Sequence, residues 1–268
     1  MYKFKYEPNP KNVILDLMGI NQPNPLETTH LVMISDIFGI SINNLRVALT
    51  RLAAKGMITN DGRGIYRLSP KTVAKRDFIN RWRSAQVINK PWDNSWIACH
   101  LPKGTDRTIR KKSLLALEWY GFKPGLDLVW VRPNNLTLSL TDLVNYLREL
   151  GLESEARTFV LAQAEDTLQT HWVNNLWATK KLDQDYDELI QALQNSIQTL
   201  QQSTPQQSLF ETCSLGGEAI HHLAIDPLLP QEIRPGDMHT RLKQTMLTYD
   251  KVGREIWLEQ LSALGVQS

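Results

Sequence analysis

The residues with the most evident binding chemistry lie in one segment, ISINNLRVALTRLAAKGMITNDGRGIYRLSP, at residues 40–70. Asparagine, threonine and arginine side chains at helical spacing can form hydrogen bonds with base edges in the major groove of DNA. The glycine-rich loop that follows carries Arg63, and an arginine at such a tip suits a phosphate or the negative potential of a minor groove. The segment therefore predicts contact with nucleic acid.

A rotation of about 100° per residue divides the predicted helix into two faces. The apolar, core-facing stripe comprises Ile42, Leu45, Ala48, Leu49 and Leu52. The opposite face and its flanks, together with the arginines of the loop and the second strand, give the candidate DNA contacts Asn43, Asn44, Arg46, Val47, Thr50, Arg51, Arg63 and Arg67.

The elements around this helix follow the order of a winged helix-turn-helix. A shorter amphipathic helix is expected at 30–38, and Ser41 and Gly56 are a good N-cap and a good C-terminal stop for the second helix. Two strands, at 57–59 and 65–68, follow with Asn60–Gly64 as their turn. The alternative is an ordinary helical hairpin beside a β-hairpin, with a polar face that is only solvated.

Charge is distributed unevenly over the 268 residues, although the net charge is only +2. Residues 1–75 carry +5, residues 76–165 carry +3 and residues 166–268 carry −6. The length allows two or three domains, so we expect a DNA-binding domain at 1–75, a middle domain at 76–165 and a third domain at 166–268. The positive end coincides with the predicted helix-turn-helix, as attraction to phosphates requires.

The middle segment predicts a ferredoxin-like α+β domain after a basic connector. Its pattern is strand, helix, strand, strand, helix, strand, at 96–101, 106–120, 119–123, 126–132, 138–150 and 157–162. The last segment is helical and Gln-rich, with helices at 166–202, at 207–224 and from 237, and with a turn at Asp226–Pro230. The expected fold is thus a multidomain α+β chain with a helical C-terminal domain for effector binding or dimerisation.

Other sequence features argue against an enzyme, a metal site or a membrane protein. Asp183, Asp185 and Asp187 alternate as in a calcium loop, but the expected glycine and terminal glutamate are absent. Adjacent histidines on a helix, as at His221 and His222, point about 100° apart and chelate one ion poorly. No apolar segment is long enough for a membrane span, and no signal peptide is recognised, so we expect a cytoplasmic protein with Cys99 and Cys213 as free thiols. No catalytic residue, metal or cofactor is expected.

The succession of motifs resembles the PaaX family of bacterial transcriptional regulators over nearly the whole chain. The motifs are LRVALTRLAAKGMI, YGFKPGLDLVWVRP, LWATKKLDQDYDELI and HHLAIDPLLPQEIRPGDMHTRLKQTM. The Asp-Pro-x-Leu-Pro signature of the family matches Asp226–Pro230. One departure is Met238, where members usually have tryptophan. Ferredoxin-like domains also occur in CRISPR-associated nucleases, but the end of the first strand, His100-Leu101-Pro102, lacks their metal-binding Asp.

The resemblance implies a repressor of a catabolic operon for phenylacetate or a related aromatic acid. It also implies a small-molecule effector, phenylacetyl-coenzyme A or another aryl-coenzyme A thioester. We expect a homodimer on double-stranded DNA, because a twofold pair of recognition helices about 34–36 Å apart multiplies specificity. The alternative function is a constitutive DNA-binding or architectural protein without an effector.

The effector pocket is expected among aromatic and cationic residues outside the winged helix. All eight tryptophans lie beyond residue 75. Most are expected to be core residues, but an aryl group could lie against a few of them, and cations could hold the phosphates of coenzyme A. The candidates are Arg107, Arg110, Trp130, Arg132, Trp177 and His222.

Overall fold

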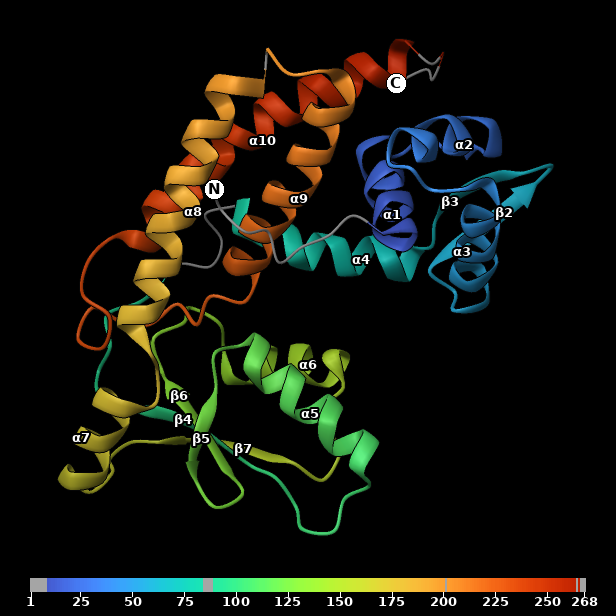
Figure 1. Ribbon diagram of the computed structural model, residues 1–268. Helices are drawn as coiled ribbons and strands as arrows, with labels where there is room; N and C mark the ends of the chain where they lie inside the picture. Colours follow the sequence, from blue (N-terminus) through green and yellow to red (C-terminus); the bar gives the residue numbers. More distant parts are fainter. Residues whose placement is uncertain (1–8, 84–88, 201, 264, 266–268) are drawn as a thin grey trace. The chain divides into compact units, whose positions relative to one another are not determined.

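The computed structural model describes residues 9–83, 89–200, 202–263 and 265, and contacts between residues divide the chain into two units. Unit 1 comprises Met1–Arg83, Glu188–His221 and Leu242–Ser268, and unit 2 comprises Ser84–Asp187 and His222–Arg241. Both units mix helices with a small antiparallel sheet, and the C-terminal region is helical (Figure 1). The division into three successive domains stays a prediction.

The first part of unit 1 alternates short helices with three short strands. In chain order these elements are α1 (Pro10–Ile20), β1 (Leu26–Glu27), α2 (Thr28–Ile37), α3 (Ile42–Ala54), β2 (Ile58–Gly62), β3 (Ile65–Leu68), α4 (Pro70–Ile79) and the 3-10 helix η1 (Asn80–Arg83). The strands form an antiparallel sheet in the order β1-β3-β2. The predicted helices at 30–38 and from residue 42, and the second strand at 65–68, are confirmed.

Local sequence explains where α3 begins and ends. The hydroxyl of Ser41 accepts a hydrogen bond from the Asn44 amide at 3.3 Å, which satisfies one of the free N–H groups at the helix start. Gly56 follows the helix with a φ of +63°, a left-handed conformation that glycine adopts without strain. Leu45, Leu49 and Leu52 are buried in the core of unit 1, so the predicted helical phase is confirmed at these positions.

Two details of the segment differ from the prediction. Ile42 was assigned to the core stripe but is 52% exposed, because it is the first residue of α3 and the core does not extend to that end. The expected five-residue turn is also wrong: β2 continues to Gly62, and Gly62 pairs with Ile65 after a bulge. The turn is therefore reduced to Arg63 and Gly64, which both have positive φ, as a tight hairpin favours.

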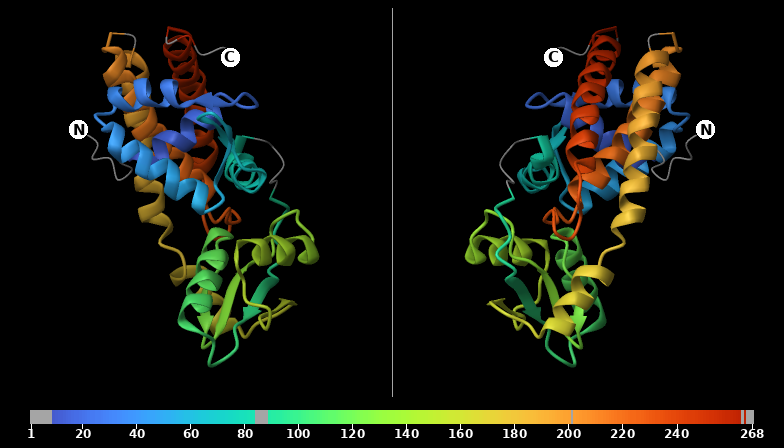
Figure 2. Two further views of the ribbon diagram at one scale, coloured as in Figure 1. Left: turned by 90° about the vertical axis from the view of Figure 1, so that its right-hand side faces the viewer. Right: turned by 90° about the vertical axis from the view of Figure 1, so that its left-hand side faces the viewer.

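The rest of unit 1 is formed by parts of three long helices. These are α8 (Thr179–Leu200), α9 (Pro205–Ala224) and α10 (Met238–Ala263), and their unit 1 portions lie side by side (Figures 1 and 2). Leu209 of α9 and Trp257 of α10 belong to the same buried cluster as Leu45 of α3. Phe38, which follows α2, stacks on Trp257 with ring centroids 5.9 Å apart. The helix-rich end of the chain thus contributes directly to the core beneath α2 and α3.

Unit 2 is built on a four-stranded antiparallel sheet. Its elements are β4 (Trp96–His100), α5 (Arg107–Trp119), β5 (Lys123–Leu126), β6 (Val129–Pro133), α6 (Leu140–Leu150), β7 (Arg157–Leu161) and α7 (Asp166–Asn175). The strand order is β5-β6-β4-β7, and α5 and α6 lie along the same face of the sheet (Figure 1). A buried cluster around Trp96 includes Trp172 of α7 and Trp177, which follows α7.

Most predicted elements of unit 2 are present, with two shifts. The second strand was expected at 119–123 but lies at Lys123–Leu126, because α5 continues to Trp119 and Gly121 turns the chain with a φ of +72°. The helix expected at 166–202 is two helices, which are separated at residues 176–178. No helix in the described part of the chain combines the length and apolarity needed to cross a bilayer.

Candidate nucleic-acid interface

The candidate interface is the outer face of α3. Its predicted contact residues are all exposed, whereas three leucines of the same helix are buried. The exposed residues are Asn43, Asn44, Arg46, Val47, Thr50 and Arg51. The hydroxyl of Thr50 donates to the carbonyl of Arg46 at 2.9 Å, so its lone pairs remain available to an external donor. The face therefore presents amide, hydroxyl and guanidinium groups to solvent.

The hairpin between β2 and β3 presents a second cation. Arg63 is exposed at its tip, between Gly62 and Gly64, which also have positive φ. The turn of the hairpin is held by Thr28 at the start of α2, whose amide and hydroxyl both donate to the Gly64 carbonyl at 2.8 Å. Because a Cβ on Gly64 would lie 2.7 Å from that hydroxyl oxygen, glycine permits this close approach. The hairpin tip is thus attached to the helix pair through its backbone.

Arg67 differs from the other predicted contacts. It is exposed on β3, but its Nε donates to the carboxylate of Asp61 on β2. A cation with a carboxylate partner attracts phosphate less strongly than Arg46 or Arg63, for which no ion pair is described. Sequence spacing did not indicate this pair, because the expected turn at Asn60–Gly64 placed Asp61 outside the strands, whereas β2 continues through Asp61 to Gly62.

Ile42 is the residue of this face that the sequence prediction missed. It is exposed at the first position of α3, next to Asn43 and Asn44. An exposed apolar side chain near the start of a recognition helix can contact the methyl group of thymine. The exposed apolar residues of α3 are therefore Ile42, at the start of the helix, and Val47 on the outer face, which is 41% exposed.

The residues predicted for an effector are dispersed over unit 2. Arg107 is exposed at the first position of α5. Arg110 is partly buried, donates to the Pro102 carbonyl and pairs with the carboxylate of Glu153 at 3.4 Å. Trp130 is partly buried on β6. Arg110 is therefore already engaged in contacts within the unit.

Arg132 and Trp177 are interior residues. The guanidinium of Arg132 donates to the carbonyls of Tyr120, Pro133 and Pro227 and to the amide oxygen of Asn135. Burial lowers the pKa of Arg132, and its acceptors are neutral oxygens. The indole N–H of Trp177 donates to the Gly121 carbonyl at 3.1 Å, so the structure brings Trp177 and Arg132 to the same turn after α5.

His222 lies beside a second network, at the turn Asp226–Pro230. Its ring is 5.8 Å from the ring of Tyr186, and its carbonyl accepts from the Tyr186 hydroxyl. The same hydroxyl donates to the buried Asp226 carboxylate at 2.5 Å, and Arg234 donates to that carboxylate at 2.8 Å. Arg234 also pairs with Asp183 at 2.8 Å, so this aspartate is an ion-pair partner rather than part of a solvated face.

The charge of Asp226 is stabilised by its surroundings. Burial alone would raise the pKa of Asp226, but the side-chain contact with His239, the charge of Arg234 and the hydrogen bond from Tyr186 hold it well below its usual range. The Nδ1 of His239 lies 3.3 Å from the carboxylate. A cluster of at least three His, Cys, Asp or Glu side chains suited to a metal is absent from the described residues. The Asp226 network is an internal clamp on the turn.

Comparison with known proteins relates the candidate interface to one family. The model of the PaaX-like protein family matches residues 11–72. We refer to this matched segment as the PaaX-like region. All eight predicted DNA contacts lie within this PaaX-like region, whereas the six predicted effector residues lie outside it.

A solved structure extends the likeness of fold beyond the PaaX-like region. It is that of the uncharacterized protein Rv0674 from Mycobacterium tuberculosis, which is 21% identical to this chain with a TM-score of 0.63. The match covers 93% of this chain and 97% of that one. No curated protein matches the chain. The likeness to the solved structure establishes a shared fold and carries no function.

Proposed function

We propose that this chain is a DNA-binding transcriptional regulator. In this proposal α2, α3 and the β2–β3 hairpin form a winged helix-turn-helix, and the α/β part of unit 2 is a ferredoxin-like domain. The observation that carries the proposal is the exposed face of α3, with its amide, hydroxyl and guanidinium groups, inside a PaaX-like region. Side chains of these types at the surface of one helix suit base edges in the major groove.

The proposed regulator is a repressor of a catabolic operon for phenylacetate or a related aromatic acid. This role rests on the PaaX-like match at residues 11–72 and on the wider resemblance of the sequence motifs. A homodimer on a twofold-symmetric operator follows from the same reasoning, because one α3 helix reads few base pairs. The proposed activity involves no catalytic step, metal or cofactor, and its site of action is the cytoplasm.

The proposed effector is an aryl-coenzyme A thioester such as phenylacetyl-coenzyme A. Release of DNA requires that the thioester bind the form with low DNA affinity more tightly than the DNA-binding form. A constitutive DNA-binding protein without an effector is the second candidate. It is favoured by the internal contacts of Arg132 and Trp177, which engage two of the residues that the sequence assigned to effector binding.

The DNA-binding proposal is tested by selecting a preferred duplex from a random library and measuring its affinity by fluorescence anisotropy. Replacement of Arg46 by alanine should cost about 1–3 kcal/mol and relax preference at one base pair. Arg63→Asn keeps a residue that tolerates positive φ, and it should weaken binding to all sequences alike and reduce the salt dependence. The matched control is Arg254→Ala, which removes an exposed arginine of α10 away from this face. Unchanged affinity in an Arg46→Ala, Arg63→Asn double variant would remove α3 as the recognition helix.

The effector proposal is tested on the complex with that duplex. Phenylacetyl-coenzyme A, other aryl thioesters and the free acids are titrated while tryptophan fluorescence and DNA release are followed together. Saturable fluorescence change with release of DNA supports a thioester effector. If no thioester changes either signal, the constitutive alternative replaces it.

A further inference from the structure

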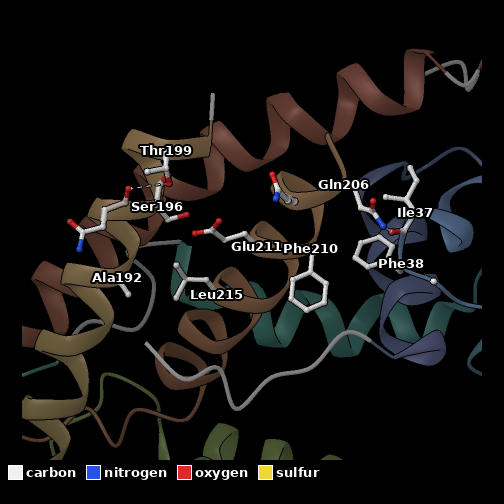
Figure 3. Close-up of a pocket in the computed structure, with 12 residues that line it drawn as sticks. Ile37, Phe38, Ala192, Ser196, Thr199, Gln206, Phe210, Glu211 and Leu215 are labelled. Carbon is white, nitrogen blue, oxygen red and sulfur yellow. Dashed lines mark hydrogen bonds between the residues drawn. The ribbon is translucent and has the colours of Figure 1, made fainter. Parts of the chain in front are cut away.

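A groove of about 670 Å³ opens on unit 1 next to the turn between α2 and α3 (Figure 3). One end is formed by Ile37, Phe38 and Gly39, and the walls come from α8 and α9. The apolar part of the α9 wall is Phe210, which is 46% exposed, and Leu215. The volume falls within the range of about 300–1,000 Å³ that is typical of small-molecule sites.

Contacts behind the groove hold its walls in place. Phe38 stacks on the buried Trp257, and the Gln206 side chain donates to the Ile37 carbonyl at 2.7 Å. On the α8 side, the Ser196 hydroxyl lies 3.1 Å from the hydroxyl of the buried Tyr249. The walls are therefore fixed by the core of unit 1, and a ligand would meet a largely formed site.

The charge of the groove selects among ligands. Glu211 is the one ionisable residue among the twelve that line it, and lysine, arginine and histidine are absent from that lining. Glu211 extends from α9 toward Ser196 on α8 (Figure 3). Behind the lining, burial raises the pKa of Tyr249, and the negative charge of Glu211 raises it further. An anionic ligand would meet no cation in this lining.

We propose that this groove binds a hydrophobic amine. The ring or alkyl body of the ligand contacts Phe210 and Leu215, and its ammonium group forms an ion pair with the Glu211 carboxylate. Phenylalanine rings also attract cations through their faces, which adds to the preference for a positive charge. The phosphates of a coenzyme A thioester have no partner here, so this site is distinct from the effector site of the proposed function.

The position of the groove gives such an amine a route to regulation. Phe38 and Gly39 belong to the short connection from α2 to α3, so a ligand in contact with them touches the segment that orients α3. An amine that binds one orientation of α3 more tightly than another would shift the population of the two orientations. The largest change in DNA affinity that it can cause equals the ratio of its own affinities for them. This coupling rests on the proposed function, whereas binding of the amine does not.

Binding is tested with the full chain, without DNA, by isothermal titration calorimetry. The probes are 2-phenylethylamine and phenylacetate, which share a ring and a two-carbon chain and differ in the sign of the charge. The amine should bind saturably and at least about tenfold more tightly than the acid, as expected for one charge-assisted contact. Equal affinities of the two probes, or no saturable binding of the amine, would overturn the proposal.

Variants locate the site. Glu211→Gln should weaken the amine about tenfold without weakening the acid, Glu211→Lys should reverse the preference, and Phe210→Ala should weaken both probes. The matched control, Glu259→Gln, removes an exposed carboxylate of α10 outside the groove and should bind the amine as the parent does. Amine binding that survives Glu211→Lys places the site elsewhere. If the amine binds but does not change the affinity for DNA, the site is kept and its coupling to DNA binding is rejected. If the parent chain binds no DNA at all, only the proposed function is rejected.

Discussion

The exposed face of α3 and the buried turn at Asp226–Pro230 use polar and charged side chains in opposite ways. On α3, Arg46 and Asn43 are exposed. At the turn, Asp226 accepts hydrogen bonds from Tyr186 and Arg234 in the interior of unit 2. Polar groups that are paired inside the fold stabilise it, whereas exposed polar groups contribute little to stability and are available to a partner. Substitutions at the turn should therefore lower stability, and substitutions on the exposed face of α3 should weaken DNA binding with little effect on stability.

The largest expected loss of stability follows from a substitution at the turn Asp226–Pro230. Asp226→Ala removes the common partner of Tyr186 and Arg234 and leaves a buried guanidinium with only Asp183, so it should destabilise the chain by about 3–5 kcal/mol. The measurement is urea unfolding followed by circular dichroism. Glu232→Ala, at an exposed position of the same connection, is the control and should change stability by less than about 0.5 kcal/mol. Similar losses in both variants would contradict the role of Asp226 as a clamp.

The core side of α3 should also affect stability strongly. Leu45 is fully buried, so Leu45→Ala should cost about 2–5 kcal/mol through lost burial and the cavity that remains. Thr50→Ala on the opposite face should cost less than about 0.5 kcal/mol and weaken DNA binding. Chemical denaturation and anisotropy on the same two proteins provide the comparison. If the threonine variant unfolds more easily than the leucine variant, the assignment of the two faces is reversed.

The contribution of Asp226 to stability should also appear, as a smaller effect, in the dependence of the free energy of unfolding on acid pH. Because the pKa of Asp226 lies well below that of an unfolded aspartate, about 3.9, the unfolded chain binds more protons as the pH falls. The stability that Asp226 contributes is thus fully present above about pH 5 and is lost as the pH falls through the unfolded pKa toward the folded one. Urea unfolding from pH 7 to pH 3 should show a shallower acid slope for Asp226→Asn than for the parent. An identical slope would show that other carboxylates dominate acid unfolding.

The sequence predicted the parts of the fold that depend on neighbours along the chain. Ser41 and Gly56 marked the ends of α3, because caps act within one helical turn. Distant contacts were not predictable in this way. Arg132 donates to the carbonyl of Pro227, and a Cβ on Gly121 would lie 2.7 Å from Pro227. Only the folded backbone brings these segments together.

The candidate interface was predicted more completely than the effector site for the same reason. One helical period placed the exposed residues of α3 on a common side, and burial of Leu45 and Leu49 confirms that phase. The effector residues came from separate segments, and composition could not tell that Arg132 would be saturated by backbone carbonyls. The same helical period also assigned Ile42 to the core, although the core ends before the first turn of α3.

The smallest expected effect on stability is at Ile42, where the sequence and the structure disagree. Because its side chain is 52% exposed, Ile42→Ala should lower the free energy of unfolding by less than about 0.5 kcal/mol, in contrast to Leu45→Ala. Under the proposed function, the same substitution should weaken the selected duplex where a thymine methyl faces the start of α3. Replacing each thymine of the duplex by uracil, one at a time, identifies that base, and the Ile42→Ala variant should be insensitive to the replacement that the parent detects. A large loss of stability in Ile42→Ala would show that Ile42 is a core residue. If each uracil replacement changes the duplex affinity of parent and variant equally, Ile42 does not contact a thymine methyl.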